Sequence, residues 1–262
     1  SWLGSIKAKT NNYVDILILG LFVPNGLVGV YSVCWNIASF LTVFGSSIST
    51  TLFPEISQLE QQDDEEEIAD LLRKSLQYTG LFVVPGFFGG VIVGPEILQL
   101  YGPDFTAGVQ VLVLLTVAVW VYDYQKQLTN VLQGMDRPDL DFRVNGLFIG
   151  LNVVLNVVLI QLFGWVGAAT ATALSSFISM IYAYHVVDRI IEVRLPVREV
   201  GKQILASILM SAIVLSLKRI EASYSILNND VLTVLGLVSI GAMSYMLLLV
   251  IVSKDTRRTV VR

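Results

Sequence analysis

Charged residues are absent from five long intervals of the sequence, which are rich in Leu, Val, Ile, Gly and Ala. The intervals are 16–54, 75–95, 105–122, 144–187 and 231–253. The hydrocarbon core of a bilayer takes about 20 apolar residues per helix, so the two longest intervals must each contain more than one span. A Pro-Asn-Gly turn sequence at 24–26 divides the first of them. Phe-Gly-Trp at 163–165 divides the other into two helices joined by a tight hairpin.

This pattern predicts an all-α integral membrane protein with about eight transmembrane helices. We expect them at residues 3–22, 27–53, 76–98, 106–133, 142–162, 166–187, 200–219 and 231–252. The seventh has a short charge-free stretch, and it becomes long enough to span if Lys202 and Lys218 extend to opposite interfaces. An even number of spans puts both ends of the chain on one side of the membrane.

The basic residues of the connecting segments lie almost entirely on one side of this arrangement. That side holds Lys7, Lys9, Arg73, Lys74, Arg137, Arg143, Arg189, Arg194, Arg198, Lys202, Lys254, Arg257, Arg258 and Arg262. The other side holds Lys218 and Arg219. Because cytoplasmic loops are enriched in Lys and Arg, we expect both termini, and the loops near 55–75, 134–143 and 188–202, in the cytoplasm.

Composition narrows the class of protein further. Of the 262 residues, 54% are hydrophobic and 15% charged, whereas globular chains carry about 25% charged residues. This balance excludes a disordered chain, a nucleic-acid-binding protein and an ordinary cytosolic enzyme. One cysteine, Cys34, and one histidine, His185, exclude a disulfide framework and leave no basis for most metal sites and hydrolase triads. We expect no metal and no cofactor, and no phosphate-binding loop that would allow nucleotide hydrolysis.

Polar residues in the first predicted helix fall on one face. Lys7, Asn11 and Asp15 are spaced i, i+4 and i+8. A charge at the middle of a bilayer is costly, so this stripe is expected to face protein or water and to contact a substrate. The alternative is that Lys7 anchors the helix at the cytoplasmic interface and that Asp15 is a neutralised packing residue.

Two further helices carry polar stripes. In the fourth, Asp123, Lys126 and Asn130 lie close to one face in the inner half of the membrane. They either line a polar vestibule open to the cytoplasm, or Asp123 and Lys126 pair with each other. In the fifth, Asn145, Asn152 and Asn156 lie close to one stripe, and they either contact a ligand or form hydrogen bonds between helices.

Other local patterns indicate packing and connection. Ladders of small residues at Gly86-Gly90-Gly94 and at Gly164-Ala168-Thr172-Ser176 predict close helix contacts. Pro85 is a candidate kink in the third helix. The acidic run 63–67, followed by leucines at helical spacing, predicts a short amphipathic cytoplasmic helix between the second and third spans.

An ordered set of short motifs resembles a known family. The motifs lie at residues 12–20, 28–31, 52–57, 100–105, 133–138, 151–156 and 163–169, and they include Leu-Phe-Pro-Glu-Ile-Ser, Leu-Tyr-Gly-Pro-Asp-Phe and Gln-Gly-Met-Asp-Arg-Pro. Their order and spacing resemble the C-terminal lobe of Wzx-like polysaccharide-biosynthesis flippases, in the multidrug/oligosaccharidyl-lipid/polysaccharide exporter superfamily. The resemblance covers roughly residues 3–190, and the last two helices match the extra pair of fourteen-helix members.

The resemblance implies two six-helix lobes that face each other across a cavity and work by alternating access. Residues 1–190 would form the C-terminal lobe, and 191–262 two additional helices and a cytoplasmic tail. Because the sequence begins at Ser1, without an initiator Met or a signal peptide, we expect it to be a fragment that lacks the N-terminal lobe. Family cavities are often rich in arginine, whereas this lobe has none at membrane depth, so the other lobe is expected to supply that part of phosphate recognition.

The same resemblance implies a transported substrate rather than a chemical reaction. The expected function is translocation of a polyprenyl-linked oligosaccharide across the cytoplasmic membrane, with Lys7 and Lys126 as available cations and Asp15 as counter-charge or coupling carboxylate. Expected partners are the lipid-linked substrate, membrane lipid and glycan polymerase or glycosyltransferase machinery, and no nucleic acid. The alternative is a multidrug or organic-cation antiporter with Asp15 as its ion site. A membrane transferase is disfavoured because the sequence shows no acid/base constellation, so we expect no enzymatic activity.

Overall fold

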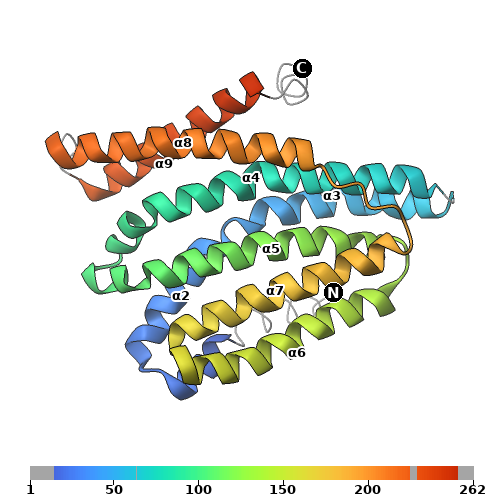
Figure 1. The fold of residues 1–262 in the computed structure, drawn as a ribbon, viewed down its shortest axis with the longest axis horizontal. Helices are drawn as coiled ribbons and strands as arrows, with labels where there is room; N and C mark the ends of the chain where they lie inside the picture. Colours follow the sequence, from blue (N-terminus) through green and yellow to red (C-terminus); the bar gives the residue numbers. More distant parts are fainter. Residues whose placement is uncertain (1–14, 63, 225–228, 253–262) are drawn as a thin grey trace.

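The structure, a computed structural model, describes residues 15–62, 64–224 and 229–252 (Figure 1). In these residues all regular structure is helical, as the apolar pattern predicts. Residues 15–22 are helical. The elements that follow are α2 (Asn25–Ser39), α3 (Thr42–Glu60), α4 (Glu65–Gln99), the short 3-10 helix η1 (Pro103–Gly108), α5 (Val109–Gly134), α6 (Pro138–Phe163), α7 (Trp165–Asp188), α8 (Val197–Tyr224) and α9 (Asp230–Val252).

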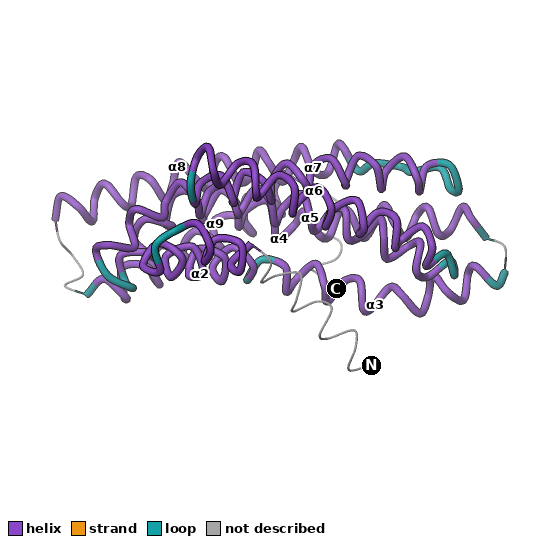
Figure 2. Tube along the Cα trace, turned by 90° about the horizontal axis from the view of Figure 1, so that it is seen from below, coloured by secondary structure: helices purple, strands orange, loops and turns teal. Residues whose placement is uncertain are grey.

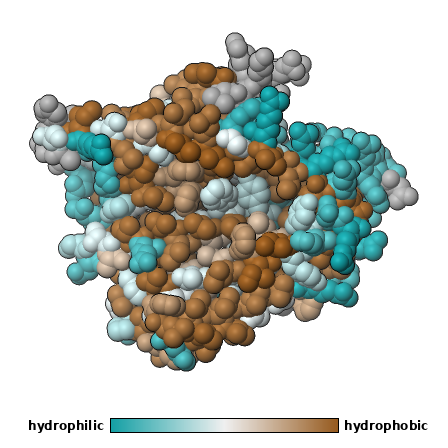
Figure 3. Space-filling view, in the orientation of Figure 1, coloured by the Kyte–Doolittle hydropathy of each residue, from teal (hydrophilic) through white to brown (hydrophobic). Residues whose placement is uncertain are grey.

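The surface and the helix lengths are those of a multi-pass membrane protein. Among the described residues, six helices are long and apolar enough to cross a bilayer, at 65–99, 103–134, 138–163, 165–188, 197–221 and 230–251. Hydrophobic side chains cover the middle of the molecule, and hydrophilic ones gather toward its two ends (Figure 3). The long helices α4 to α9 run in one general direction in both perpendicular views (Figures 1 and 2), whereas α2 is inclined to them in Figure 1.

The sequence predicted one continuous helix at 27–53, and this prediction was wrong because the structure has two helices there. The chain breaks at Phe40 and Leu41, between α2 and α3. Two hydroxyls bond to backbone oxygens at the break: Ser39 Oγ donates to Asn36 O at 3.1 Å, and Thr42 Oγ1 donates to Ser39 O at 2.8 Å. Such bonds compete with the helical hydrogen-bond ladder, and a search for charge-free intervals does not detect them. The α3 segment is also too polar to count as a candidate span, so the eight-span prediction is supported only for six helices.

The short cytoplasmic helix expected near residue 63 is the first part of α4, which continues without interruption into the membrane. Asp64 caps this helix by accepting a hydrogen bond from the Glu67 backbone N–H at 3.1 Å, and acidic residues fill the first turn. At about 1.5 Å per residue, the 35 residues of α4 span about 50 Å, well beyond a hydrocarbon core of about 30 Å. The acidic turn therefore projects outside the membrane. Pro85 and Pro95 lie inside this single helix without ending it.

The remaining spans agree closely with the sequence pattern. Pro138 is at the start of α6, where its missing N–H is tolerated. Gly164 has φ 59°, a left-handed conformation that suits glycine, and it forms the predicted hairpin between α6 and α7. A side chain at Gly167 would overlap the carbonyl oxygen of Leu159, so the two helices approach at backbone distance.

Helix α5 is at the centre of the bundle and packs against α2, α3, α4, α6 and α7. The pair α8–α9 joins the bundle through α4, by an apolar cluster that includes Val93, Met210, Val214 and Tyr245. Near the far end of α8, the Lys218 ammonium is 2.6 Å from a Glu96 carboxylate oxygen and donates to the backbone oxygen of Ile92 at 3.0 Å. Helices α8 and α9 thus lie together on one side of the bundle, against α4 (Figure 1). Their status as a pair additional to a lobe stays a prediction.

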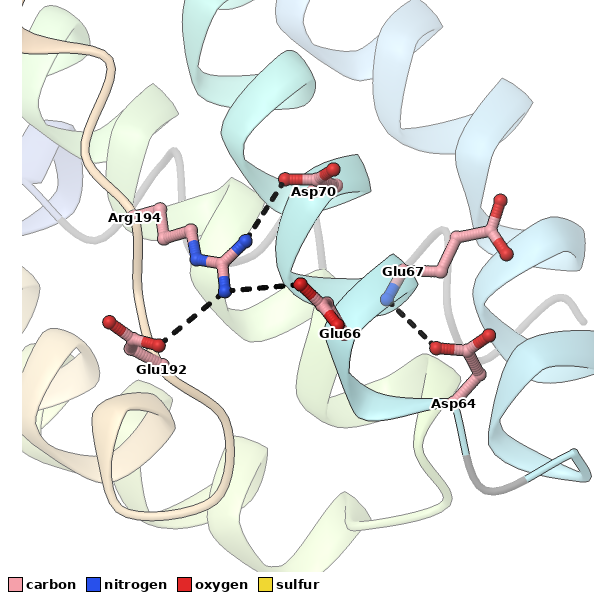
Figure 4. Close-up of polar contacts among 6 residues, drawn as sticks. All are labelled: Asp64, Glu66, Glu67, Asp70, Glu192 and Arg194. Carbon is pink, nitrogen blue, oxygen red and sulfur yellow. Dashed lines mark hydrogen bonds and ion pairs between the residues drawn. The ribbon is translucent and has the colours of Figure 1, made fainter.

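Three connections meet at one end of the molecule: α3–α4, α5–α6 and α7–α8 (Figure 1). The distribution of Lys and Arg predicts that these three connections lie on the same side of the membrane. Their position at one end of the molecule agrees with that prediction. The cytoplasmic identity of that side, and the placement of both termini there, stay predictions. At this end Arg194 of the α7–α8 connection is within 3.5 Å of Glu66 and 3.6 Å of Asp70 on α4, and 3.6 Å of Glu192 (Figure 4).

The ion pairs of Arg194 connect the α7–α8 segment to the first turns of α4. The Glu192 carboxylate, with smaller contributions from Glu66 and Asp70, raises the pKa of the Arg194 guanidinium above its usual value. The side chains are exposed, and exposed ion pairs contribute little to stability and weaken with salt. The contact therefore positions the connection rather than holding the lobe together.

Candidate functional site

The buried carboxylate of Asp15 joins three neighbouring helices. Asp15 is 6% exposed. Its Oδ2 accepts hydrogen bonds from Tyr31 Oη of α2 at 3.2 Å and from Thr172 Oγ1 of α7 at 2.6 Å. Its Oδ1 accepts one from Asn156 Nδ2 of α6 at 2.8 Å. All three donors are neutral, so the structure satisfies the carboxylate oxygens without supplying a balancing positive charge at hydrogen-bond distance.

Two of the three asparagines predicted on one stripe of α6, Asn152 and Asn156, belong to this cluster, whereas Asn145 Nδ2 donates to Asp141 Oδ1 at 2.6 Å instead. Asn156 Nδ2 is 3.1 Å from Asn152 Oδ1, and Asn152 Nδ2 donates to Thr172 Oγ1 at 3.3 Å. These bonds connect α6 to α7 and to Asp15, which is the alternative of hydrogen bonds between helices; contact of the two amides with a ligand stays a prediction. The Oδ1 atom of Asn156 is buried without a hydrogen-bond partner.

The oxygen atoms gathered here determine what the cluster can do chemically. One carboxylate, two amide oxygens and two hydroxyls form a set without sulfur or imidazole, which suits a proton or a small hard cation rather than a transition metal. In the described part of the chain no group of three or more His, Cys, Asp and Glu side chains could hold a metal ion. An event that neutralised Asp15 would act on three helices at once, because each contributes a donor.

A cavity of about 170 Å³ opens beside the cluster. Its walls come from the segment 15–22, from the start of α3 and from α2, α5, α6 and α7, and they include Asp15, Trp35, Ser39, Thr42, Tyr122, Lys126, Phe148, Asn152, Thr172 and Ser176. Lys126 and Asp15 both line this cavity, yet among the described residues no ion pair joins Lys126 to a carboxylate. Hydroxyls, aromatic rings, one cation and one carboxylate thus surround a single cavity within the bundle.

The polar stripe predicted on α5 is divided between two faces. Lys126 faces the cavity, whereas Asp123 and Asn130 are directed toward α3, where Asn130 Nδ2 donates to Ser49 Oγ. Asp123 is fully buried and does not form the ion pair with Lys126 that was one alternative. The use of Asp123 and Asn130 in substrate binding stays a prediction.

Several residues of the site were not expected from the sequence. Tyr31 and Thr172 hydrogen-bond to Asp15, and Gln127 accepts from Ser49 at 3.0 Å and Ser75 at 2.5 Å. Thr172 appeared in the sequence only as a step in a small-residue ladder, and a single Tyr or Gln in an apolar helix carries no distinguishing spacing. Lys7 and Asn11 lie outside the described residues, so their roles stay predictions.

Comparisons of the whole sequence find flippases. The family model described as the lipid II flippase MurJ matches residues 4–246. A probable flippase, AglR, of Haloferax volcanii is 33% identical over 262 residues, which cover 99% of this chain and 54% of the relative. A probable low-salt glycan biosynthesis flippase, Agl15, of the same organism is 27% identical over 229 residues, which cover 87% of this chain and 48% of the relative.

A solved structure has the same fold. It is described as the lipid II flippase MurJ in an inward closed conformation, and it aligns with a TM-score of 0.77 and 18% identity. The alignment covers 96% of this chain and 51% of that one. The chain therefore spans about half the length of the relatives and of the solved structure that it matches.

Proposed function

The chain belongs to the family of the lipid II flippase MurJ, and we propose that it forms the second lobe of a transporter that moves a polyprenyl-linked oligosaccharide across the cytoplasmic membrane. The observation that carries the proposal is the buried Asp15, bonded to three helices beside a cavity that Lys126 also lines. The two relatives named as flippases, one of them for glycan biosynthesis, favour the same class of substrate. The proposed protein is a transporter and performs no covalent chemistry.

The physical task of such a transporter is to carry a charged head group through an apolar layer. A charge in hydrocarbon is costly unless protein groups or water surround it. Lys126 of α5, together with Lys7 near the start of the sequence, would attract the phosphate group that links lipid and glycan. The hydroxyls and aromatic rings of the cavity suit contacts with sugar, while the lipid chain remains in the bilayer.

Asp15 would connect binding to movement. Alternating access requires the helices of a lobe to change their relative positions, and the donors to Asp15 come from α2, α6 and α7. A cation, a proton or a substrate ammonium group that neutralised Asp15 would weaken these bonds together. The carboxylate therefore has the position expected of a counter-charge or a coupling group.

The arrangement in the membrane completes the proposal. Residues 1–190 would be the lobe, and 191–262 the additional pair and a cytoplasmic tail, with the α3–α4, α5–α6 and α7–α8 connections also in the cytoplasm. A second lobe would face the cavity and supply further cations. Membership of the wider multidrug/oligosaccharidyl-lipid/polysaccharide superfamily, and contact with glycosyltransferases or a polymerase, belong to this same proposal.

Deleting the full-length gene tests the function. We expect lipid-linked oligosaccharides to accumulate on the cytoplasmic leaflet and glycans to disappear from the cell surface, because the precursor is made but not moved. Mass spectrometry of extracted lipids, together with analysis of surface glycans, measures both quantities. Unchanged glycans, combined with new sensitivity to organic cations, would contradict the proposal and favour the antiporter.

A further inference from the structure

A second carboxylate, Asp123, is buried where α5 meets α3, away from the cluster around Asp15. Its residue is 0% exposed, and both carboxylate oxygens are buried without a hydrogen-bond partner. The carboxylate lies against the backbone of α3 at Gly45, where an added Cβ would be 3.2 Å from Asp123 Cγ and Oδ2. Glycine at this position allows the two helices to enclose the side chain.

The neighbouring polar groups of this contact are already engaged with one another. Gln127 Nε2 donates to the backbone oxygen of Gly45 at 3.2 Å, and its Oε1 accepts from Ser49 and Ser75. Asn130 donates to Ser49. The network joins α3, α4 and α5. Its donors bond to acceptors within the network, and none of them donates to Asp123. In this respect Asp123 differs from Asp15, which has three donors.

Lys126 lies one turn along α5 from Asp123. It is not within ion-pair distance and faces the cavity instead. Tyr122 and Tyr124 are the titratable residues next to Asp123 on the same helix. The helices packed against α5 carry these further titratable residues: Tyr31 and Cys34 on α2; Glu55 and Glu60 on α3; Glu65, Glu66, Glu67, Asp70, Arg73, Lys74, Tyr78 and Glu96 on α4; Asp139, Asp141 and Arg143 on α6; and Tyr182, Tyr184, His185 and Asp188 on α7. In the described structure none of these forms a hydrogen bond or ion pair with Asp123.

An ionised carboxylate in such a place is shielded from bulk solvent and has no protein donor, so its burial is far more costly than that of the neutral acid. We propose that the α3–α5 contact at Asp123 is a proton-binding site: the closed contact holds Asp123 as the neutral acid, and loss of the proton to water opens α3 from α5. In the open form water solvates the carboxylate, and Lys126 stabilises its negative charge. A proton is taken from water on closing and returned on opening, so no other reactant is needed.

The proposal goes beyond the transport function and does not depend on its cargo. It concerns a contact between helices whose strength changes with pH. The break between α2 and α3 at Phe40 and Leu41 is the proposed hinge for the movement of α3. Because the closed form binds one more proton than the open form, acid stabilises the contact and alkali weakens it. This direction distinguishes it from a contact that packing alone maintains.

Disulfide cross-linking in the full-length protein tests the proposal in native membranes, with the other cysteines replaced. Ser49→Cys with Asn130→Cys reports the α3–α5 contact, and Gln125→Cys with Ser179→Cys reports the α5–α7 contact, where the native side chains are 2.7 Å apart. The second pair is the matched control for the effect of pH on thiol chemistry. Between about pH 5 and about pH 9 we expect cross-linking of the first pair, relative to the control pair, to fall by about fivefold.

Two variants assign the effect to Asp123. Asp123→Asn is neutral at every pH and should make the ratio of the two cross-links independent of pH. Lys126→Gln removes the cation that stabilises the ionised form, so the midpoint of the pH dependence should move to higher pH. A ratio that does not change with pH in the parent protein would overturn the proposal. The proposal also fails if Asp123→Asn keeps the parent's pH dependence or, should that variant not fold, if Lys126→Gln leaves the midpoint unchanged.

Discussion

Replacing Asp15 with alanine in the full-length protein abolishes glycan export, with a loss of at least about tenfold, equivalent to about 1.4 kcal/mol. The substitution removes the common acceptor of Tyr31, Asn156 and Thr172. Tyr31 loses its acceptor, whereas Asn156 and Thr172 keep hydrogen bonds to Asn152 and to the Ala168 backbone oxygen. A buried donor left without a partner costs about 1–3 kcal/mol, so the variant should also unfold at a lower temperature. Export is measured by complementation of the deletion strain, and stability by thermal unfolding of the purified protein.

Two further variants separate the charge of Asp15 from its role in packing. Asp15→Asn keeps the shape of the side chain, and we expect it to fold but to lose export, because the negative charge is gone. Asn145→Ala is the control: Asn145 is on α6 like Asn152 and Asn156, but it bonds to Asp141 outside the cluster. Near-normal export by Asp15→Ala would show that the site is wrongly assigned, and it would leave the fold unaffected.

Substituting Gly167 with alanine destabilises the α6–α7 hairpin by about 3 kcal/mol or more, at the upper end of the cost of overpacking. The added Cβ would overlap the Leu159 carbonyl oxygen, which belongs to the backbone and cannot rotate away. The helices must separate, and the cluster of Asn152, Asn156 and Thr172 between them should loosen as well. Thermal unfolding of the full-length protein in detergent measures the effect.

The control for this prediction is on the same hairpin. Gly150 of α6 has no atom within 4 Å of an added Cβ. Replacing glycine by alanine in a helix is favourable by up to about 1 kcal/mol, so Gly150→Ala should be neutral or stabilising. Equal unfolding temperatures for the two variants would contradict the backbone contact at Gly167.

Much of the fold follows from intervals without charge, because a helix in lipid must be apolar over its whole length. The helices expected at 142–162, 166–187 and 231–252 correspond closely to α6, α7 and α9. The pattern does not report the break at Phe40 and Leu41, which depends on hydroxyl–backbone hydrogen bonds within an uncharged interval. It also does not report the union of the acidic turn with α4, because outside the membrane a helix can continue through charged residues.

The site was predictable where helical periodicity carries the information. Spacing by one turn placed Asn152 and Asn156 on a common face, and the structure directs that face at Asp15. Periodicity within one helix cannot identify the partners on other helices, so Tyr31 and Thr172 were missed. On α5 the side chains of residues 123, 126 and 130 leave the helix axis in similar directions. The positions of α3 and the cavity decide which of the two each side chain faces.

Transport by the purified full-length protein in liposomes tests the proposed function most directly. The probe is the lipid-linked oligosaccharide fraction extracted from the deletion strain, loaded into the inner leaflet, with a membrane-impermeant glycan-cleaving reagent outside. We predict that the inner-leaflet substrate becomes accessible in liposomes with the native protein, and that Asp15→Ala liposomes behave like protein-free ones. If native-protein liposomes protect the substrate as well as protein-free liposomes do, the protein is not a flippase for this substrate and the proposed function is wrong.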